Sequence, residues 1–129
     1  MTRKHIQRGW YERSNGEKVF LRSKWEINFA AYLDWLVGLG EIKGWRYEPT
    51  EFEFHAVKRG TRYYKPDFQV INHDGSVVWY EVKGRWTQKA KTQVNRFRKY
   101  YPDEKLIIVD ADAYKAIARS CGNLVPGWR

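Results

Sequence analysis

The sequence contains a single cysteine, Cys121, among its 129 residues. One cysteine excludes an internal disulfide and any zinc site built from several cysteines, and we expect this one to be inert. The three histidines, His5, His55 and His73, are scattered without the spacing of metal ligands, and His73 reads as a turn residue. Neither residue type therefore indicates a metal site or a redox site.

Long hydrophobic runs are also missing. No apolar stretch approaches the roughly 18 to 20 residues of a membrane-spanning helix, and the basic N-terminus lacks the apolar core of a signal peptide. No internal repeat or low-complexity segment is present. The sequence therefore predicts no membrane partner and a cytoplasmic protein.

Acidic residues are scarce: 15 Asp and Glu face 24 Lys and Arg, which gives a net charge of +9. A balance of this kind is typical of a protein that binds a polyanion. The length predicts one domain over residues 1–129, and a hydrophobic fraction of 43% is enough to fill its core.

One segment, between Glu81 and Asp103, has no acid at all. Its bases are Lys83, Arg85, Lys89, Lys91, Arg96, Arg98 and Lys99. Cations placed on one side of a helix bind phosphates without reading base sequence, and their contribution falls steeply with salt. The alternative is a helix whose charges are merely solvated.

Residues 1–18 form the other basic segment, in which Gly9, Asn15 and Gly16 interrupt any helical or strand period. We expect a mobile basic arm that either wraps DNA or is simply disordered. Trp10, Tyr11 and Trp86 lie in basic polar surroundings and are candidates for contact with DNA. The candidate DNA-binding residues are Arg3, Lys4, Arg8, Arg13, Arg22, Lys24, Arg85, Trp86, Lys89, Lys91 and Arg96.

The most informative motif is Tyr64-Lys65-Pro66-Asp67-Phe68, followed by Glu81-Val82-Lys83-Gly84. Apolar runs at 68–71 and 77–82 flank an Asp-Gly pair, which predicts a hairpin with a tight turn. If the turn is centred on residue 74, Asp67 lies opposite Glu81. Strand alternation then places Glu81 and Lys83 on one face of the strand. Val82 lies on the opposite face, which we expect to be the core face.

Two carboxylates opposed across a hairpin repel each other, and a bound cation would remove that repulsion. Oxygen ligands suit Mg²⁺ or Mn²⁺, which bind through one or two carboxylates together with waters and a substrate phosphate. With Lys83 beside them, Asp67 and Glu81 indicate a metal-dependent nuclease. The alternative interpretation is a set of solvated charges on an exposed edge of the sheet.

The remaining pattern predicts helices separated by short strands. Gly38 and Gly40 end the first helix, and Pro102 closes the second. The helices are expected from about 23 to 38, 88 to 100 and 112 to 119, and the strands at 45–47, 52–54, 62–64, 68–71, 77–82 and 105–109. The order α-β-β-β-α-β favours a mixed α+β fold with a central mixed sheet flanked by helices.

Glu26 has two interpretations. Ser23-x-x-Glu26 is the pattern of a capping box, in which the glutamate bonds the cap amide. At 100° per residue, however, Glu26 falls within the apolar sector of the helix. A buried carboxylate needs a cation, hydrogen bonds or a proton, so Glu26 is a candidate third acid of the metal site.

The segments Phe20 to Glu26, Tyr47-Glu48, Tyr64 to Phe68 and Glu81 to Trp86 together resemble the bacteriophage endonuclease I type of Holliday-junction resolvase, within the PD-(D/E)XK nuclease superfamily. The resemblance runs in order over residues 20–110. It implies a restriction-endonuclease-like core and a homodimer that nicks four-way DNA junctions, leaving 5′-phosphate and 3′-hydroxyl ends.

By the same resemblance, each active site would hold one or two Mg²⁺ or Mn²⁺ ions. Glu26, Asp67 and Glu81 would be the acids, the Val82 carbonyl a further ligand and Lys83 the catalytic lysine. Aromatic strands at 45–54 are candidates for pairing between subunits. If a phage encodes the protein, as the resemblance implies, it would lie in the host cytoplasm. Two alternatives remain open: another endonuclease of this superfamily, of repair or transposition type, and a noncatalytic DNA-binding module.

Overall fold

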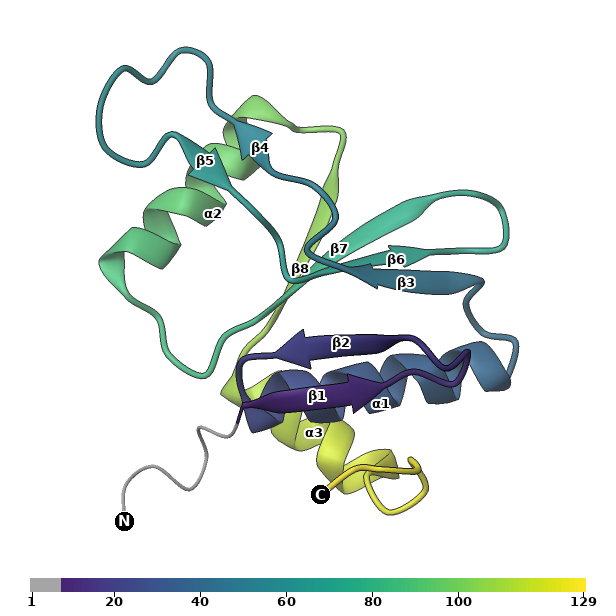
Figure 1. The fold of residues 1–129 in the computed structure, drawn as a ribbon. Helices are drawn as coiled ribbons and strands as arrows, with labels where there is room; N and C mark the ends of the chain where they lie inside the picture. The colour runs from purple at the N-terminus through teal and green to yellow at the C-terminus, as the bar shows by residue number, and fades with distance from the viewer. Residues whose placement is uncertain (1–7) are drawn as a thin grey trace.

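The computed structural model describes residues 8–129. This part of the chain folds into three helices, a four-stranded sheet and two small two-stranded sheets, a mixed α+β arrangement (Figure 1). The elements are β1 (Gly9–Glu12), β2 (Lys18–Leu21), α1 (Lys24–Gly38), β3 (Gly44–Tyr47), β4 (Phe52–Glu53), β5 (Tyr63–Tyr64), β6 (Phe68–Ile71), β7 (Val77–Val82), α2 (Gln88–Tyr100), β8 (Lys105–Val109) and α3 (Ala111–Cys121).

The central sheet has the strand order β3-β6-β7-β8. Strands β3, β6 and β7 pair antiparallel, whereas β8 joins β7 in parallel after the crossover through α2. Read along the chain, α1, β3, β6, β7, α2 and β8 reproduce the predicted order α-β-β-β-α-β and its mixed sheet. The β1–β2 and β4–β5 pairs and the helix α3 are additions to that core.

The β6–β7 hairpin has the predicted register. Phe68 pairs with Tyr80 and Ile71 with Val77, so Asp67, one step before β6, lies beside Glu81. The turn contains Gly75 with a φ of 86°, a left-handed conformation that glycine adopts without a steric penalty. The Asp-Gly signal and strand alternation were therefore sufficient to fix which residues face each other.

Both faces of the central sheet are covered. On one face, Phe29 and Leu33 of α1 pack with Phe68, Val70 and other apolar side chains. On the other face, Val94 and Phe97 of α2 pack with Tyr64, Trp79 and Leu106. Phe29 and Phe97 are almost completely buried, and burial of a side chain of this size contributes roughly 1.5 to 3 kcal/mol. The hairpin thus sits between two cores, which fixes its position.

Side-chain caps set the starts of the helices. The Ser23 hydroxyl accepts a hydrogen bond from the Glu26 amide over 3.1 Å, and Thr87 does the same for Ala90 at the start of α2. Asp110 caps α3 through the amide of Ala113. These bonds satisfy amides that have no partner within the helix. The predicted helix starts near 23 and 88 are confirmed.

The prediction for residues 1–18 was wrong over its second half. Gly9–Glu12 and Lys18–Leu21 form an antiparallel hairpin that packs on α1, instead of an irregular arm. The overlooked signal is Asn15-Gly16, a typical hairpin pair, and Gly16 has a φ of 90°. Arg3 and Lys4 lie outside the described residues.

The aromatic side chains of the strands at 45–54 are more buried than expected, although β3 is an edge strand of the central sheet. Trp45 in β3 is only 2% exposed and belongs to the core beneath α1, and β3 pairs with β6. Phe52 in β4 packs against Trp79 and Phe97, and β4 pairs with β5. The homodimer and the pairing of these strands between subunits stay predictions. Among the described residues, no helix is long and apolar enough to span a bilayer.

Candidate active site

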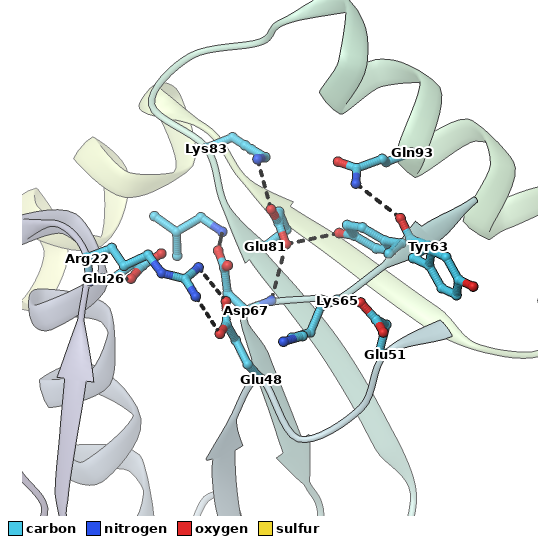
Figure 2. Close-up of a pocket in the computed structure, with 12 residues that line it drawn as sticks. Arg22, Glu26, Glu48, Glu51, Tyr63, Lys65, Asp67, Glu81, Lys83 and Gln93 are labelled. Atoms are coloured by element: carbon cyan, nitrogen blue, oxygen red, sulfur yellow. Dashed lines mark hydrogen bonds and ion pairs between the residues drawn. The ribbon is translucent and has the colours of Figure 1, made fainter. Parts of the chain in front are cut away.

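The predicted acids meet at one end of the β6–β7 hairpin, in a polar cleft of about 350 Å³ (Figure 2). Asp67 precedes β6, Glu81 lies near the end of β7, and Glu26 comes from the first turn of α1. The cleft is lined by Arg22, Glu26, Glu48, Glu51, Tyr63, Tyr64, Lys65, Asp67, Glu81, Val82, Lys83 and Gln93.

Asp67, Glu81 and Lys83 form the centre of the cleft. The Asp67 amide donates to Glu81 Oε1 over 3.2 Å, and Asp67 Oδ2 accepts from the Val82 amide over 2.8 Å. Lys83 Nζ lies 2.9 Å from Glu81 Oε2. Both carboxylates are 5% exposed, whereas the Lys83 side chain is 26% exposed at the cleft mouth. The hairpin register therefore brings together the acids and the lysine that the sequence singled out.

The electrostatics of Asp67 are unfavourable for an anion. Burial raises the pKa of its carboxyl well above the ordinary value, and the nearby Glu81 and Glu26 carboxylates raise it further. The Val82 amide and Lys83 lower the pKa of Asp67 but do not offset these effects. A buried acid in this situation is stabilised by a proton or by an additional cation.

Glu81 is held by a residue that sequence reasoning did not assign. The buried Tyr64 hydroxyl donates to Glu81 Oε1 over 3.0 Å. This bond and the Asp67 amide both act on Oε1, so Oε2 remains on the side of Lys83. Tyr64 is the first residue of the acidic motif, but the sequence pattern indicates only a strand residue at this position.

Glu26 enters the same cleft but in a different setting. Its Oε1 accepts hydrogen bonds from the Arg22 amide and the Tyr47 hydroxyl, each over 2.9 Å. The glutamate thus bonds the residue before the helix cap, not the Ser23 amide of an ordinary capping box. Burial raises the pKa of the Glu26 carboxyl above its usual value. The expected inward orientation is confirmed, since Glu26 is 8% exposed.

The side-chain positions do not yet form a closed metal cage. Within residues 8–129, no three His, Cys, Asp or Glu side chains gather closely enough to hold an ion by themselves. Asp67 and Glu81 are adjacent, whereas Glu26 is turned towards Arg22 and Tyr47. A hard cation here would be held by one or two carboxylates and complete its shell with water or substrate, which is the usual manner of Mg²⁺.

Arg22 and Glu48 form a pair at the edge of the cleft that the sequence did not reveal. The guanidinium donates to both oxygens of Glu48, over 2.6 and 2.8 Å, in a bidentate arrangement (Figure 2). Glu48 is the only described non-glycine residue with a positive φ, 46°, and its amide donates to the Asp67 carbonyl over 2.8 Å. Arg22, a candidate DNA-binding residue, is thus already paired with an acid in this structure.

The other DNA-binding candidates divide into free and engaged side chains. Arg85, Trp86, Lys89 and Lys91 are exposed along the loop after Lys83 and the first turn of α2, and Arg8 is exposed before β1. Lys24, at the start of α1, is half-buried.

Two candidates have structural partners. The Arg13 guanidinium donates to the Trp45 carbonyl over 2.7 Å and stacks on the Trp45 ring, and Arg96 donates to the Thr61 carbonyl. For Arg13 and Arg96, binding to DNA would compete with these contacts.

Gly84, directly after Lys83, lies against the Trp25 ring of α1. A Cβ atom at this position would be 3.4 Å from the ring, at the tight end of ordinary contact. Trp25 itself stacks on Tyr114 of α3, with ring centroids 4.2 Å apart and planes inclined by 7°. The backbone after Lys83 thus runs close to α1, and a Cβ at residue 84 would be in ordinary contact with the Trp25 ring.

The fold and the cleft define a mixed α+β protein with a buried acidic pair and a lysine at the end of a central hairpin. The chain belongs to the family described as "Protein of unknown function (DUF1064)", which matches residues 17–116. The matched segment includes all four residues of the candidate site, Glu26, Asp67, Glu81 and Lys83. Comparison with curated proteins and with solved structures gives no match for this chain.

Proposed function

We propose that this protein is a metal-dependent DNA endonuclease that cuts branched DNA. The observation that carries the proposal is the contact of Asp67 and Glu81 at the end of the hairpin, with Lys83 Nζ 2.9 Å from Glu81 Oε2. A purely structural acidic pair gains nothing from being buried side by side. Burying the two acids together becomes favourable if a cation and a phosphate complete the site.

The residues present fit a hard divalent cation. Asp67 and Glu81 supply carboxylate oxygens, the Val82 carbonyl is a further candidate ligand, and Glu26 lines the same cleft. The raised pKa of Asp67, caused first by burial and then by Glu81 and Glu26, indicates a site that favours an extra positive charge. A bound Mg²⁺ or Mn²⁺ would supply a Lewis acid for the phosphate and a more acidic water.

Side chains of the protein itself would stabilise charge, orient Glu81 and bind the DNA backbone. Lys83 places an ammonium at the cleft mouth, where it stabilises negative charge that develops on a phosphate. Tyr64 and the Asp67 amide hold the Glu81 carboxylate in one orientation. The exposed bases Arg85, Lys89 and Lys91 would bind the sugar-phosphate backbone and keep a strand across the cleft.

The assignment to the PD-(D/E)XK superfamily is part of the proposal. It is supported by the order α1-β3-β6-β7-α2-β8, by the acids at the end of the hairpin and by Glu26 on the preceding helix. The finer reading is a homodimer that resolves four-way junctions by paired cuts, with 5′-phosphate and 3′-hydroxyl ends. This reading rests on the resemblance of residues 20–110 and not on any contact in the structure.

The test compares a labelled four-way junction with duplex, nicked and single-stranded DNA of the same sequence, in Mg²⁺ and in EDTA. Symmetric, metal-dependent nicks confined to the junction would support a resolvase. Equal cutting of plain duplex would contradict junction selectivity and favour another endonuclease with the same residues. Binding to DNA without cutting in Mg²⁺ or Mn²⁺ would contradict the enzyme and leave a DNA-binding module.

A further inference from the structure

A further basic segment precedes Asp67 and lies beside α2, the helix that carries most of the bases after Lys83. Between Glu53 and Asp67 the chain has no acid, and its bases are Lys58, Arg59, Arg62 and Lys65. Residues 54–62, which connect β4 to β5, form what we call the β4–β5 loop. Figure 1 shows this loop projecting from the body of the molecule beside α2.

The β4–β5 loop is held in place by α2. The Gln93 side chain donates to the Tyr63 carbonyl over 3.2 Å, and Arg96 donates to the Thr61 carbonyl. At the other end of the loop, the Tyr101 hydroxyl donates to the Glu53 carbonyl over 2.6 Å. Phe54 is completely buried against the rings after α2. A surface loop fixed by three side chains at its backbone is positioned for contact.

The tip of the loop presents unpaired positive charge. Lys58 and Arg59 are exposed and, over the described range 8–129, neither forms an ion pair. Arg62 is 3.8 Å from Glu53 and is therefore partly neutralised. Gly60, with a φ of 71°, turns the chain directly after Arg59. Like charges gathered on a protruding turn are unfavourable alone and favourable against a polyanion.

The loop is continuous with the cleft. Tyr63, Tyr64 and Lys65, which follow it, all line the cleft. The six residue-to-residue steps from Arg59 to Lys65 span at most about 20 Å when extended. Successive phosphates of one DNA strand are about 3.4 Å apart along the axis, so the tip of the loop lies within roughly six nucleotides of a phosphate bound in the cleft.

We propose that the β4–β5 loop is a second DNA-binding surface, which contacts the backbone of duplex DNA flanking the cleft through Lys58 and Arg59. The inference rests on the proposed function for the position of the DNA. Together with α2, which is also free of acids, the loop forms one positive surface beside the acidic cleft. Contacts of this kind fix orientation and carry no base-sequence information.

The test measures binding of a labelled DNA duplex by fluorescence anisotropy in EDTA, over a series of salt concentrations. The loop variant is Lys58→Glu/Arg59→Glu, and the matched control is Lys115→Glu/Arg119→Glu on the exposed side of α3, which changes the net charge equally. The neutral variant Lys58→Gln/Arg59→Gln removes the two positive charges without adding acids, so it separates the loss of the bases from repulsion by new acids. Far-ultraviolet circular dichroism and thermal unfolding verify that each variant folds.

We expect the loop variant to bind about tenfold more weakly near physiological salt. The negative slope of log K against log salt should become shallower by about two, since two phosphate contacts are lost. The neutral variant should show the same loss of slope, and the α3 variant should keep the wild-type slope. Equal slopes for all proteins, or an equal loss in the α3 variant, would overturn the proposal.

This outcome is separate from the outcome for the enzyme, because binding is measured without divalent metal. A wild-type protein that binds through the loop but never cuts DNA would remove the nuclease proposal and keep the surface. Metal-dependent cutting with an unchanged salt slope in the loop variants would keep the nuclease and remove the surface.

Discussion

The Tyr64 hydroxyl donates a hydrogen bond to Glu81 Oε1 over 3.0 Å, at a position where both side chains are buried. The same carboxylate contacts Lys83 through its other oxygen, Oε2. Tyr64 lies in β5 and Glu81 in β7, so the bond joins the small β4–β5 sheet to the central sheet. The orientation of the central acid therefore depends on a strand that carries no acid itself.

Replacing Tyr64 with Phe should weaken catalysis without disturbing the core. The ring still packs against Phe97, but Glu81 loses a donor and its orientation. We expect a stability loss of about 1 kcal/mol and a fall in cleavage or metal affinity of about tenfold. Cleavage rates over a Mg²⁺ titration measure this. Tyr32→Phe, at a half-buried tyrosine of α1 outside the cleft, is the control and should keep wild-type activity. An equal fall in both variants would refute the positioning role.

Stability in EDTA should decrease as pH rises from mildly acidic values. The pKa of Asp67 in the folded protein is raised by burial, then by Glu81 and Glu26. In the unfolded chain, Asp67 ionises near its ordinary pKa of about 4. Between these two values the folded state binds more protons, so the free energy of unfolding falls as pH increases. Above the raised pKa, the loss from this group is complete.

Denaturant unfolding at a series of pH values in EDTA tests this dependence. Asp67→Asn lacks the titrating carboxyl, so the free energy of unfolding of this variant should fall less over the same pH range. Asp112→Asn on α3 is the control and should behave like the wild type. Mg²⁺ should restore stability to the wild type at neutral pH and have less effect on Asp67→Asn. A wild-type stability that rises with pH in this window would contradict the account.

Glu48 should tolerate glycine better than alanine. Both substitutions remove the carboxylate that Arg22 binds, but only glycine adopts a φ of 46° without a steric penalty. We expect Glu48→Gly to be more stable than Glu48→Ala by about 1 kcal/mol, the reverse of the usual order. Urea unfolding of the two variants measures the difference. A more stable alanine variant would mean that the backbone relaxes out of the left-handed region.

The ion pair between Arg22 and Glu48 should itself contribute little to stability. The Arg22 side chain is 61% exposed, so solvent screens the pair despite its bidentate geometry. A double-mutant cycle with Arg22→Gln and Glu48→Gln should give a coupling of less than about 1 kcal/mol. A coupling several times larger would indicate that the pair holds the start of α1 against the end of β3.

Lys83→Ala should abolish most activity while leaving DNA binding nearly intact. Lys83 is the ammonium closest to Glu81 and stands at the cleft mouth. Loss of one group that stabilises charge in a transition state costs about a hundredfold or more in rate. Single-turnover cleavage measures the loss, with Lys105→Ala on β8 as the control. Wild-type cleavage by Lys83→Ala would exclude a catalytic role for this lysine.

The part of the site that could be predicted depends on local sequence signals. An Asp-Gly turn between two alternating strands determined the register, and the register placed Asp67 beside Glu81. The Ser23 cap determined the start of α1 and hence the side of the helix on which Glu26 lies. These features follow from residues a few positions apart, or from a period of two or 3.6 residues.

The remainder depends on contacts between distant segments. Arg22 and Glu48 are separated by 26 positions, and no local pattern announces a non-glycine residue in the left-handed region. Tyr64 bonds Glu81 across 17 positions, and Gln93 of α2 bonds the Tyr63 carbonyl across 30 positions. The β1–β2 hairpin was a different case, since Asn15-Gly16 was visible in the sequence and the short strands around it were overlooked.

The most direct test of the central claim is cleavage of a labelled four-way DNA junction by the wild type, Asp67→Asn and Asp112→Asn, each in Mg²⁺ and in EDTA. We expect metal-dependent nicks with 5′-phosphate ends for the wild type and Asp112→Asn, and none above background for Asp67→Asn. Cleavage by Asp67→Asn at the wild-type rate, or cleavage that persists in EDTA, would contradict the assignment of the Asp67, Glu81 and Lys83 cleft as a nuclease site.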